Sequence, residues 1–290
     1  MKILFWLFRI KAHILSKLPF GILYFFSGLV TFILCYIVKY RKNIIVNNLR
    51  NSFPEKSIGE INKLTNVFYR NLADIMFEII KLGNISKEEL FRRVSVEGQD
   101  VLDRISSKNQ EVVVVMSHSG NWEWVSQRVC FAGVGFDDAG VIAKEISNSY
   151  FERYFTRIRL RLQKGIADII PFTETARHLA TKRHKASMII AIADQSPHKD
   201  QILFRTSFLH QNTGVFLGPE RIARSLDYAV VFWHVKHTVR GFYKVYFELI
   251  TDTPKETAQY YITEAHVKML EGDIRQEPET WLWSHRRWKY

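Results

Sequence analysis

Residues 111–124 read EVVVVMSHSGNWEW, and this stretch decides the fold. Its four consecutive valines and Met116 predict a strand that is buried on both faces. The Ser, His, Gly and Asn that follow favour a sharp turn, and Trp122 opens an apolar run typical of a helix. In open α/β sheets, ligands bind at the carboxyl ends of the strands. We therefore expect His118 at a binding edge of the sheet.

Apolar strands and helical segments alternate along the rest of the chain, beginning near residue 94. This alternation predicts an α/β fold in which a sheet is flanked by helices. A second fully apolar strand, MIIAIA at 188–193, ends directly before Asp194. The last predicted strand, 242–250, alternates between apolar and polar residues as a strand at the edge of a sheet would.

An uncharged segment at residues 18–38 is about long enough to cross a bilayer. Tyr, Phe and Gly occur on every face of it, which argues against a core helix packed on one side. Ahead of it, residues 1–16 mix apolar side chains with lysine and arginine, as an interfacial helix does. We predict an N-terminal membrane anchor at residues 1–42, either a single span or a deep insertion, followed by one domain at residues 43–290.

The chain is strongly basic, because 41 lysines and arginines against 29 acidic residues give a formal net charge of +12. Such an excess favours an anionic partner: nucleic acid, anionic lipid or an acidic carrier protein. Cys35 and Cys130 are the two cysteines, too few for a disulfide framework. The large basic part after the anchor therefore favours a domain on the cytoplasmic, reducing side of the membrane.

His118 and Glu123 are the first candidates for chemistry. A neutral imidazole can remove the proton from a hydroxyl as it attacks, and a carboxylate can hold the ring in the required tautomer. Gly120 and Asn121 lie between them and allow close approach of the backbone. No serine stands in a G-x-S-x-G turn, so the sequence does not suggest a covalent serine intermediate. A buried histidine that bonds only to backbone is an equally weighted alternative.

Other charged residues lie where they could support the same reaction. Asp194 follows an apolar strand, so it should organise an arginine or the substrate, or cap the following turn. Residues 153–161, RYFTRIRLR, form the most basic helical segment. Its arginines either make a solvated face or stabilise an oxyanion or a phosphate.

The segment at residues 279–290, ETWLWSHRRWKY, interleaves aromatic and basic side chains. This pattern suits single-stranded nucleic acid, but it also suits an interfacial aromatic belt in which Arg286 and Arg287 bind lipid headgroups. The predicted anchor favours the membrane interpretation, so we expect no nucleic acid partner. We expect no metal site either, since His234 and His237 are three apart on a strand and face opposite sides.

Five segments together resemble the bacterial lipid A late acyltransferases, the lauroyl/myristoyl class. They are YRKNIIVNNLRNSFPEKS at 40–57, SHSGNWEW at 117–124, ADQSP at 193–197, LGPERIARSLDYAVVFWHVKH at 217–237 and PETWLWSHRRWKY at 278–290. The similarity runs nearly from end to end of the chain. It implies a glycerolipid-acyltransferase-like fold with a mixed central sheet. It also implies an enzyme of the bacterial inner membrane, with its acyltransferase domain at residues 43–290 on the cytoplasmic side.

The resemblance further implies a reaction and the residues that carry it. A fatty acyl chain would pass from acyl carrier protein to a hydroxyl of a lipid A precursor, without a metal or redox cofactor. The implied site residues are His118 and Glu123 as the family's H-x4-[D/E] dyad, Asp194 and Gln195 as its Asp-Gln pair, and Arg159 or Arg161 as its arginine, of which Arg159 is favoured.

Two other interpretations stay open at the level of sequence. One keeps the chemistry and changes the acceptor to a lysophospholipid, an aminolipid or another glycolipid, because acceptor choice depends on the shape of a groove; the donor could equally be an acyl-CoA. The other is a non-catalytic, membrane-anchored protein whose basic surface binds nucleic acid or anionic lipid in a salt-sensitive way. That second interpretation leaves unexplained why His118 and Glu123 stand at the end of a core strand.

Overall fold

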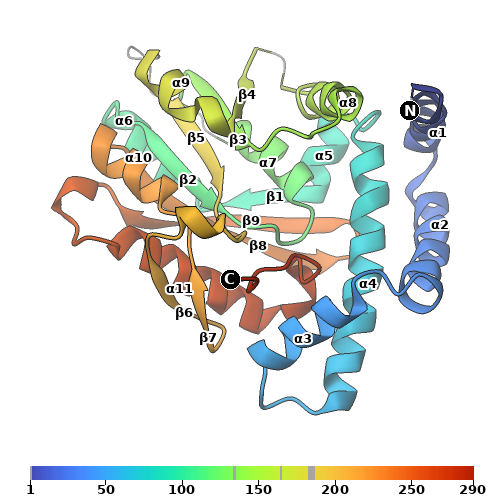
Figure 1. Ribbon diagram of the computed structural model, residues 1–290. Coiled ribbons are helices and arrows are strands. Elements are labelled where there is room, and N and C mark those ends of the chain that lie inside the picture. The colour runs from blue at the N-terminus through green and yellow to red at the C-terminus, as the bar shows by residue number, and fades with distance from the viewer. Residues whose placement is uncertain (1, 133–134, 164, 182–186) are drawn as a thin grey trace.

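The computed structural model describes residues 2–132, 135–163, 165–181 and 187–290, and a seven-stranded sheet forms its centre (Figure 1). The strand order is β1-β9-β8-β2-β5-β3-β4. The strands are β1 Val94–Glu97, β2 Val112–Met116, β3 Asp138–Ala143, β4 Ala167–Pro171, β5 Ser187–Ile192, β8 Ala229–Val239 and β9 Phe242–Thr251. Strands β8 and β9 pair antiparallel and the other pairs are parallel, so the sheet is mixed, as predicted.

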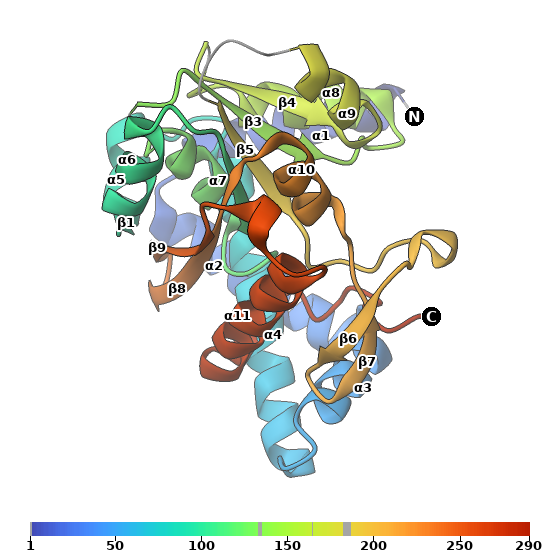
Figure 2. The ribbon, with the colours of Figure 1, turned by 90° about the vertical axis from the view of Figure 1, so that its left-hand side faces the viewer.

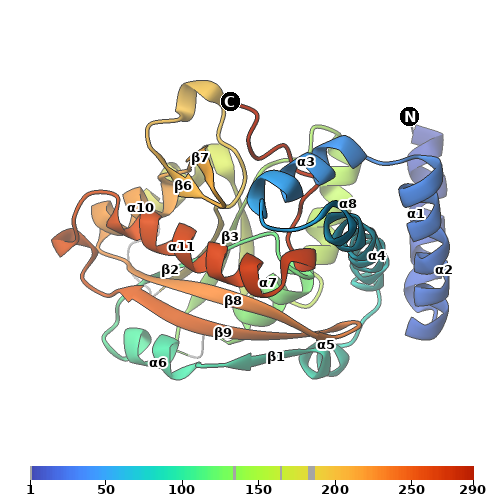
Figure 3. The same cartoon turned by 90° about the horizontal axis from the view of Figure 1, so that it is seen from below.

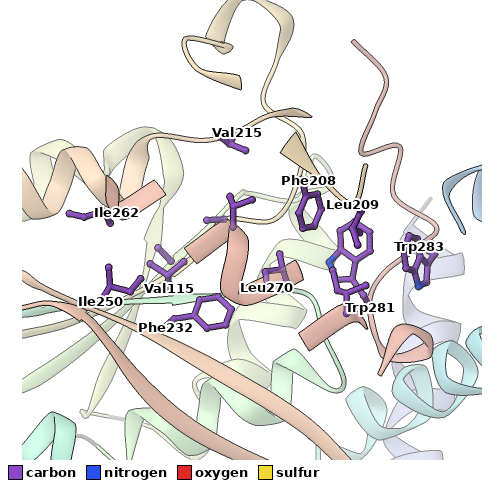
Figure 4. Packing of buried hydrophobic residues seen from close by; sticks show 14 of the residues in the cluster. Val115, Phe208, Leu209, Val215, Phe232, Ile250, Ile262, Leu270, Trp281 and Trp283 are labelled. Carbon is purple, nitrogen blue, oxygen red and sulfur yellow. The ribbon is translucent and has the colours of Figure 1, made fainter. Parts of the chain in front are cut away.

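The predicted central strand is confirmed, and β2 is buried along its whole length. Val113 and Val115 point into one hydrophobic core, and Val112 and Val114 point into the other. Figure 4 shows Val115 packed with Phe232 of β8 in the first of these cores. Because β2 pairs in parallel with both β5 and β8, all three strands end at the same edge of the sheet.

Helices cover both faces of the sheet, each over its own core. One face carries α5 Lys87–Arg93, α6 Asp100–Ser107, α7 Trp122–Cys130 and α8 Ser149–Arg159. The other carries α3 Lys42–Ser52, α4 Ile58–Lys81, α9 Thr175–Thr181, α10 Gly218–Leu226 and α11 Tyr261–Gln276. Apolar residues therefore stabilise the sheet from both sides and leave its strand ends available for polar residues.

One prediction for the sheet is wrong. Strand β9 is not an edge strand, because it pairs with β1 on one side and β8 on the other. Its residues alternate because Tyr243, Val245 and Phe247 are buried in the core under α5–α7, while their neighbours on the opposite face are less covered. Two elements were not predicted at all: helix α11 and the hairpin of β6 Arg205–Phe208 and β7 Gln211–Gly214.

The N-terminal segment forms two helices that precede the sheet. Helix α1 spans Lys2–Lys17, and α2 spans Phe20–Phe32 and continues as a π-helical turn, Ile33–Ile37. Within the described part of the chain, residues 20–37 form the one helix that is long and apolar enough to cross a membrane. Helix α2 packs along α4, and most of its side chains remain exposed.

Candidate active site

His118 and Asp194 meet at the shared edge of β2 and β5. The imidazole Nδ1 of His118 lies 2.7 Å from Oδ1 of Asp194, and the backbone N–H of His118 donates to Oδ2 at 3.0 Å. This contact follows from the topology, since β2 and β5 are parallel neighbours and each of the two residues stands two positions beyond the end of its strand. Asp194 therefore fixes both the ring and the backbone of His118.

The carboxylate of Asp194 is buried but ionised. Burial alone would raise its pKa, but the His118 ring, the His118 backbone N–H and the Trp281 indole N–H lower it to about 2. The indole Nε1 of Trp281 donates to Oδ2 at 2.8 Å. An ionised carboxylate accepts the Nδ1 proton, which leaves the lone pair of His118 on Nε2. Near that nitrogen, the Nε2 amide of Gln195 lies 3.3 Å away.

Asp194 should make the stability of the fold depend on pH under acidic conditions. A carboxyl whose pKa is lower in the folded chain than its ordinary 3.8 stabilises the fold above that value, and the contribution is lost as pH falls toward 2. The difference in Tm between the native protein and Asp194→Asn should narrow between about pH 4 and pH 2. Thermal unfolding in detergent checks this, and a difference that widens on acidification would contradict it.

The predicted partnership of Glu123 with His118 is wrong in its geometry. The carboxylate of Glu123 instead pairs with Arg159, whose Nε and Nη2 donate to its two oxygens at 2.8 and 2.5 Å. Glu123 follows His118 by five residues in the first turn of α7, whereas Asp194 is 76 residues away in sequence and holds the ring. The acid that orients His118 is therefore the distant one.

Arg159 and Arg161 have different roles, although both were candidates for the same function. Burial would lower the pKa of Arg159, but the hydrogen bond and charge of Glu123 raise it, so its guanidinium stays cationic beside that carboxylate. Arg161 donates to the backbone carbonyls of Leu82 and Ile85 and fixes the connection between α4 and α5. Of the two, Arg159 is the one joined to the helix that follows the His118 turn.

Gly120 and Asn121 shape the turn that carries His118. Gly120 has φ +56°, and a Cβ there would lie 3.0 Å from the Tyr243 ring and 3.1 Å from Val235. Only glycine accommodates both constraints. The side chain of Asn121 caps α7 by accepting from the backbone N–H of Trp124 at 3.0 Å. The backbone of this turn thus closely approaches side chains of the protein core.

Glu78, which the sequence analysis did not single out, holds the same turn through side-chain hydrogen bonds. It is buried in α4 and accepts hydrogen bonds from Asn121 at 2.9 Å, Tyr243 at 2.8 Å and Tyr24 at 2.9 Å. Burial raises the pKa of the Glu78 carboxyl. The signal available in the sequence was the pair of acids, Asp74 and Glu78, within the apolar run of α4. This network links α2, α4 and β9 to the loop that presents His118.

The segment after α11 is part of the site, which corrects its predicted place in a membrane belt. Trp281 and Trp283 are fully buried, and Trp281 packs with both Phe208 of the hairpin and Trp283 (Figure 4). Gly120 donates its backbone N–H to the Thr280 carbonyl at 3.1 Å, so the segment runs beside the His118 turn. Figure 2 shows its end beside the β6–β7 hairpin and α3.

His285 ties this segment to the loop after Asp194. Its Nε2 accepts the backbone N–H of Ser196 at 3.1 Å, and burial lowers the pKa of the ring to about 4, so it is neutral. Arg286 is exposed, but Arg287 is 4% exposed and donates to the Gly214 carbonyl at 2.7 Å. A buried guanidinium cannot reach a lipid headgroup, so that prediction is withdrawn for Arg287 and stays open for Arg286.

The two histidines weighed as metal ligands have other environments. His234 contacts Asp273 through Nδ1 at 2.7 Å and Glu248 through Nε2 at 3.1 Å, and His237 donates its backbone N–H to Glu277. Within residues 2–132, 135–163, 165–181 and 187–290, no group of three or more His, Cys, Asp or Glu side chains is arranged to hold a metal ion.

Comparison with known proteins points to one activity. A model of the bacterial lipid A biosynthesis acyltransferase family matches residues 1–290. Two relatives are each 24% identical over 280 residues, which cover 94% of this chain and 87% of theirs. They are the lipid A biosynthesis palmitoleoyltransferase of Escherichia coli (strain K12) and the lipid A biosynthesis acyltransferase of Shigella flexneri. Because the family match covers the whole chain, this protein belongs to the bacterial lipid A biosynthesis acyltransferases.

Proposed function

We propose that the protein transfers a fatty acyl chain from an acyl carrier protein thioester to a hydroxyl of a lipid A precursor, with His118 as the general base. The contact between His118 and Asp194 carries this proposal. It leaves Nε2 of a partly exposed imidazole as proton acceptor, and general acid–base catalysis needs such an acceptor within reach of the reacting hydroxyl. Asp194 takes the orienting role first assigned to Glu123.

The reaction then runs through one tetrahedral intermediate. Nε2 of His118 takes the proton of the acceptor hydroxyl as its oxygen attacks the thioester carbonyl carbon. The carbonyl oxygen becomes an oxyanion. When the carbon–sulfur bond breaks, the carrier's thiolate leaves and takes the proton back from the imidazolium. Asp194 stabilises that imidazolium between the two proton transfers, as the acid of a Ser-His-Asp triad does.

Arg159 is our candidate for stabilising the oxyanion, and Glu123 is its positioning residue. A guanidinium held by two hydrogen bonds to a buried carboxylate is pre-oriented, so it costs little reorganisation when charge develops. Glu123 stands in the first turn of the helix that follows His118, which brings this ion pair to the same end of the sheet. Glu123 thus keeps a place in the site without touching the base.

The basic net charge of the chain favours the binding of both proposed substrates. Acyl carrier proteins are acidic, and a protein with a net charge of +12 attracts them from a distance. The acceptor is anionic and resides in a membrane, where the apolar N-terminal helices would place the enzyme. We propose the inner membrane as the location, with the domain at residues 43–290 on the cytoplasmic side, where acyl carrier protein is found.

Mass spectrometry of lipids tests the acceptor. A strain that lacks this protein should accumulate lipid A with one acyl chain fewer, and the native gene should restore it. The purified protein should transfer the chain from acyl carrier protein to the isolated precursor. Unchanged lipid A together with a loss of acylated phospholipid would reject the proposed acceptor.

Replacing Arg159 with glutamine should lower kcat by about 10²- to 10³-fold with a small effect on KM. The physical reason is that one preorganised donor to an oxyanion contributes a factor of about that size. Glu123→Gln, which keeps the shape but loses the charge of the partner, should lower kcat less. Steady-state transfer from acyl carrier protein in detergent micelles gives both constants.

Arg161→Gln is the matched control for this prediction. It removes a guanidinium two residues away whose partners are the carbonyls of Leu82 and Ile85. We expect this variant to lower Tm and to leave kcat of the remaining folded protein close to native. Equal losses of kcat at both arginines would refute the assignment of the oxyanion role to Arg159.

Trp281 should act as a positioning residue through its hydrogen bond to Asp194. Trp281→Phe keeps an aromatic ring in the core but removes the indole N–H together with part of the bicyclic ring, so kcat should fall about tenfold, the size of one bond to a charged group. Without the indole N–H, the Asp194 carboxylate would stabilise the imidazolium more strongly. The acidic limb of the pH–rate profile, where the base becomes protonated, should therefore move to higher pH.

Trp283→Phe is the control for Trp281→Phe, because Trp283 is equally buried and donates its N–H to the Pro278 carbonyl. It should lower Tm by a similar amount and leave the pH–rate profile in place. A profile that moves in both variants, or in neither, would mean that Trp281 has a structural role alone.

A further inference from the structure

Helices α1 and α2 both expose many apolar side chains on one edge of the molecule. Figures 1 and 3, seen at right angles to each other, both show the two helices along the same edge, with α4 between them and the sheet. The exposed large side chains here are Ile3, Leu4, Trp6, Leu7, Ile10, Ile14, Ile22, Phe25, Phe26, Leu29, Phe32, Tyr36, Ile37 and Val38. Phe25, for example, is 74% exposed. A surface of this size and composition marks a site of interaction with a membrane or another apolar partner.

Helix α1 is fixed to the domain by aromatic side chains. Phe5 packs against Tyr150 and Phe151 of α8 with ring centroids 5.3 and 5.4 Å apart. Phe8 packs against Phe151 at 5.1 Å and Tyr154 at 5.4 Å. Its other face remains exposed. Helix α1 therefore cannot turn away from the domain without breaking these contacts.

Helix α2 is fixed by polar contacts in its middle. The hydroxyl of Tyr24 donates to Glu78 at 2.9 Å, and the hydroxyl of Ser27 donates to Asp74. Arg240, in the turn between β8 and β9, pairs with Asp74 at 2.6 Å and donates to the Tyr24 carbonyl at 3.2 Å. The candidate spanning helix thus contacts three ionisable residues of the domain.

These contacts are incompatible with α2 as a transmembrane span. A helix of 18 residues crosses the hydrocarbon core of about 30 Å only if its axis runs along the bilayer normal. Asp74, Glu78 and Arg240, which contact the first half of this span, would then lie within the hydrocarbon core, where ionisable groups are costly. Helix α4 would be drawn in beside it, and its exposed Arg70 would face lipid.

We infer that α1 and α2 lie side on in one leaflet of a lipid bilayer and that neither helix crosses it. The exposed apolar side chains listed above would enter the leaflet to the depth of an interfacial helix. The polar contacts of α2 would stay on the side of the domain, outside the hydrocarbon. Basic side chains pair with aromatic rings in the middle of α1 and after α2, a combination that suits the headgroup level. Arg9 lies 4.8 Å over the Trp6 ring, and Arg41 lies 5.6 Å from the Tyr40 ring.

Labelling of single cysteines distinguishes this arrangement from a span. Lys17→Cys precedes α2, Asn43→Cys follows it, and Lys63→Cys on α4 marks the side of the domain; all three positions are exposed. The buried Cys35 and Cys130 are replaced by serine and alanine. In sealed inverted membrane vesicles, a membrane-impermeant maleimide should label all three positions without detergent. Protection of position 17 alone would show that α2 crosses the bilayer and would overturn the inference.

A second measurement tests the lipid contact itself. The double variant Leu7→Lys with Leu29→Lys places one charge on each helix of the proposed surface, where the native side chains are 50% and 54% exposed. Its binding to vesicles of phosphatidylethanolamine and phosphatidylglycerol should weaken by about tenfold or more. Leu203→Lys is the matched control, because Leu203 is 59% exposed outside α1 and α2. Native binding by the double variant, or equal losses in both, would overturn the lipid-facing surface.

Discussion

Replacing His118 with alanine should lower kcat/KM for acyl transfer by about 10³- to 10⁴-fold, at the upper end of what a general base contributes. Asp194 accepts the Nδ1 proton, so the lone pair on Nε2 would take the hydroxyl proton, and the nearby Gln195 amide could not accept that proton in place of the ring. The measurement is transfer of a radiolabelled acyl chain by purified protein, with Tm recorded for each variant.

The control for this prediction is His198→Ala. His198 is an exposed histidine that also faces an aspartate, Asp200, at 3.1 Å. Its loss should leave transfer and Tm unchanged. If His118→Ala folds with native Tm and keeps more than about a tenth of native kcat/KM, the role of general base must be reassigned.

Asp194→Asn should be nearly as damaging, with a loss on the order of 10³- to 10⁴-fold in kcat. Asparagine can keep accepting the Trp281 indole N–H, but its amide group would donate to Nδ1 of His118. The ring would then hold its proton on Nε2, the nitrogen that must be free. Substrate binding does not use this carboxylate in our mechanism, so KM should change little.

Asp273→Asn provides the matched control, because it makes the same exchange at another pair of the same geometry. The Nδ1 atom of His234 lies 2.7 Å from Asp273, the same distance as in the pair formed by His118 and Asp194. Acyl transfer by Asp273→Asn should stay close to that of the native protein. Comparable losses of kcat at both aspartates would indicate that each acts on the stability of the fold and would remove Asp194 from the mechanism.

Much of the fold could be predicted from local sequence. The four valines of β2 have no polar residue between them, so burial on both faces followed directly, and the strand at 188–193 had the same character. Strand β9 shows the limit of this reasoning. Alternation along a strand reports which faces are buried, not how many strands pair with it, and β1 is a four-residue partner from a distant part of the chain.

The sequence singled out His118, Asp194, Glu123 and Arg159, but it did not reveal which of these side chains pair with one another. His118 and Asp194 both follow apolar strands, and their chemistry suggested function. These two strands are neighbours because of the strand order of the whole sheet, and a local sequence pattern does not reveal that order. Proximity in sequence favoured Glu123 as the partner of His118, whereas the register of β2 and β5 favours Asp194. Trp281 was misplaced for a related reason, since alternating aromatic and basic residues suit a membrane surface and a buried segment equally well.

The position of Trp281 in the chain has a consequence for how the enzyme matures. The indole N–H that binds the proposed catalytic carboxylate of Asp194 lies more than 240 residues after α2, so a ribosome at ordinary speed completes it roughly 10 to 50 s later. Glu78, which holds the His118 turn, and the apolar helices are all made long before. During translation the chain thus presents its proposed lipid-binding surface first and its finished base last. A nascent chain can settle on the bilayer, among its acceptors, while it is still unable to consume an acyl donor.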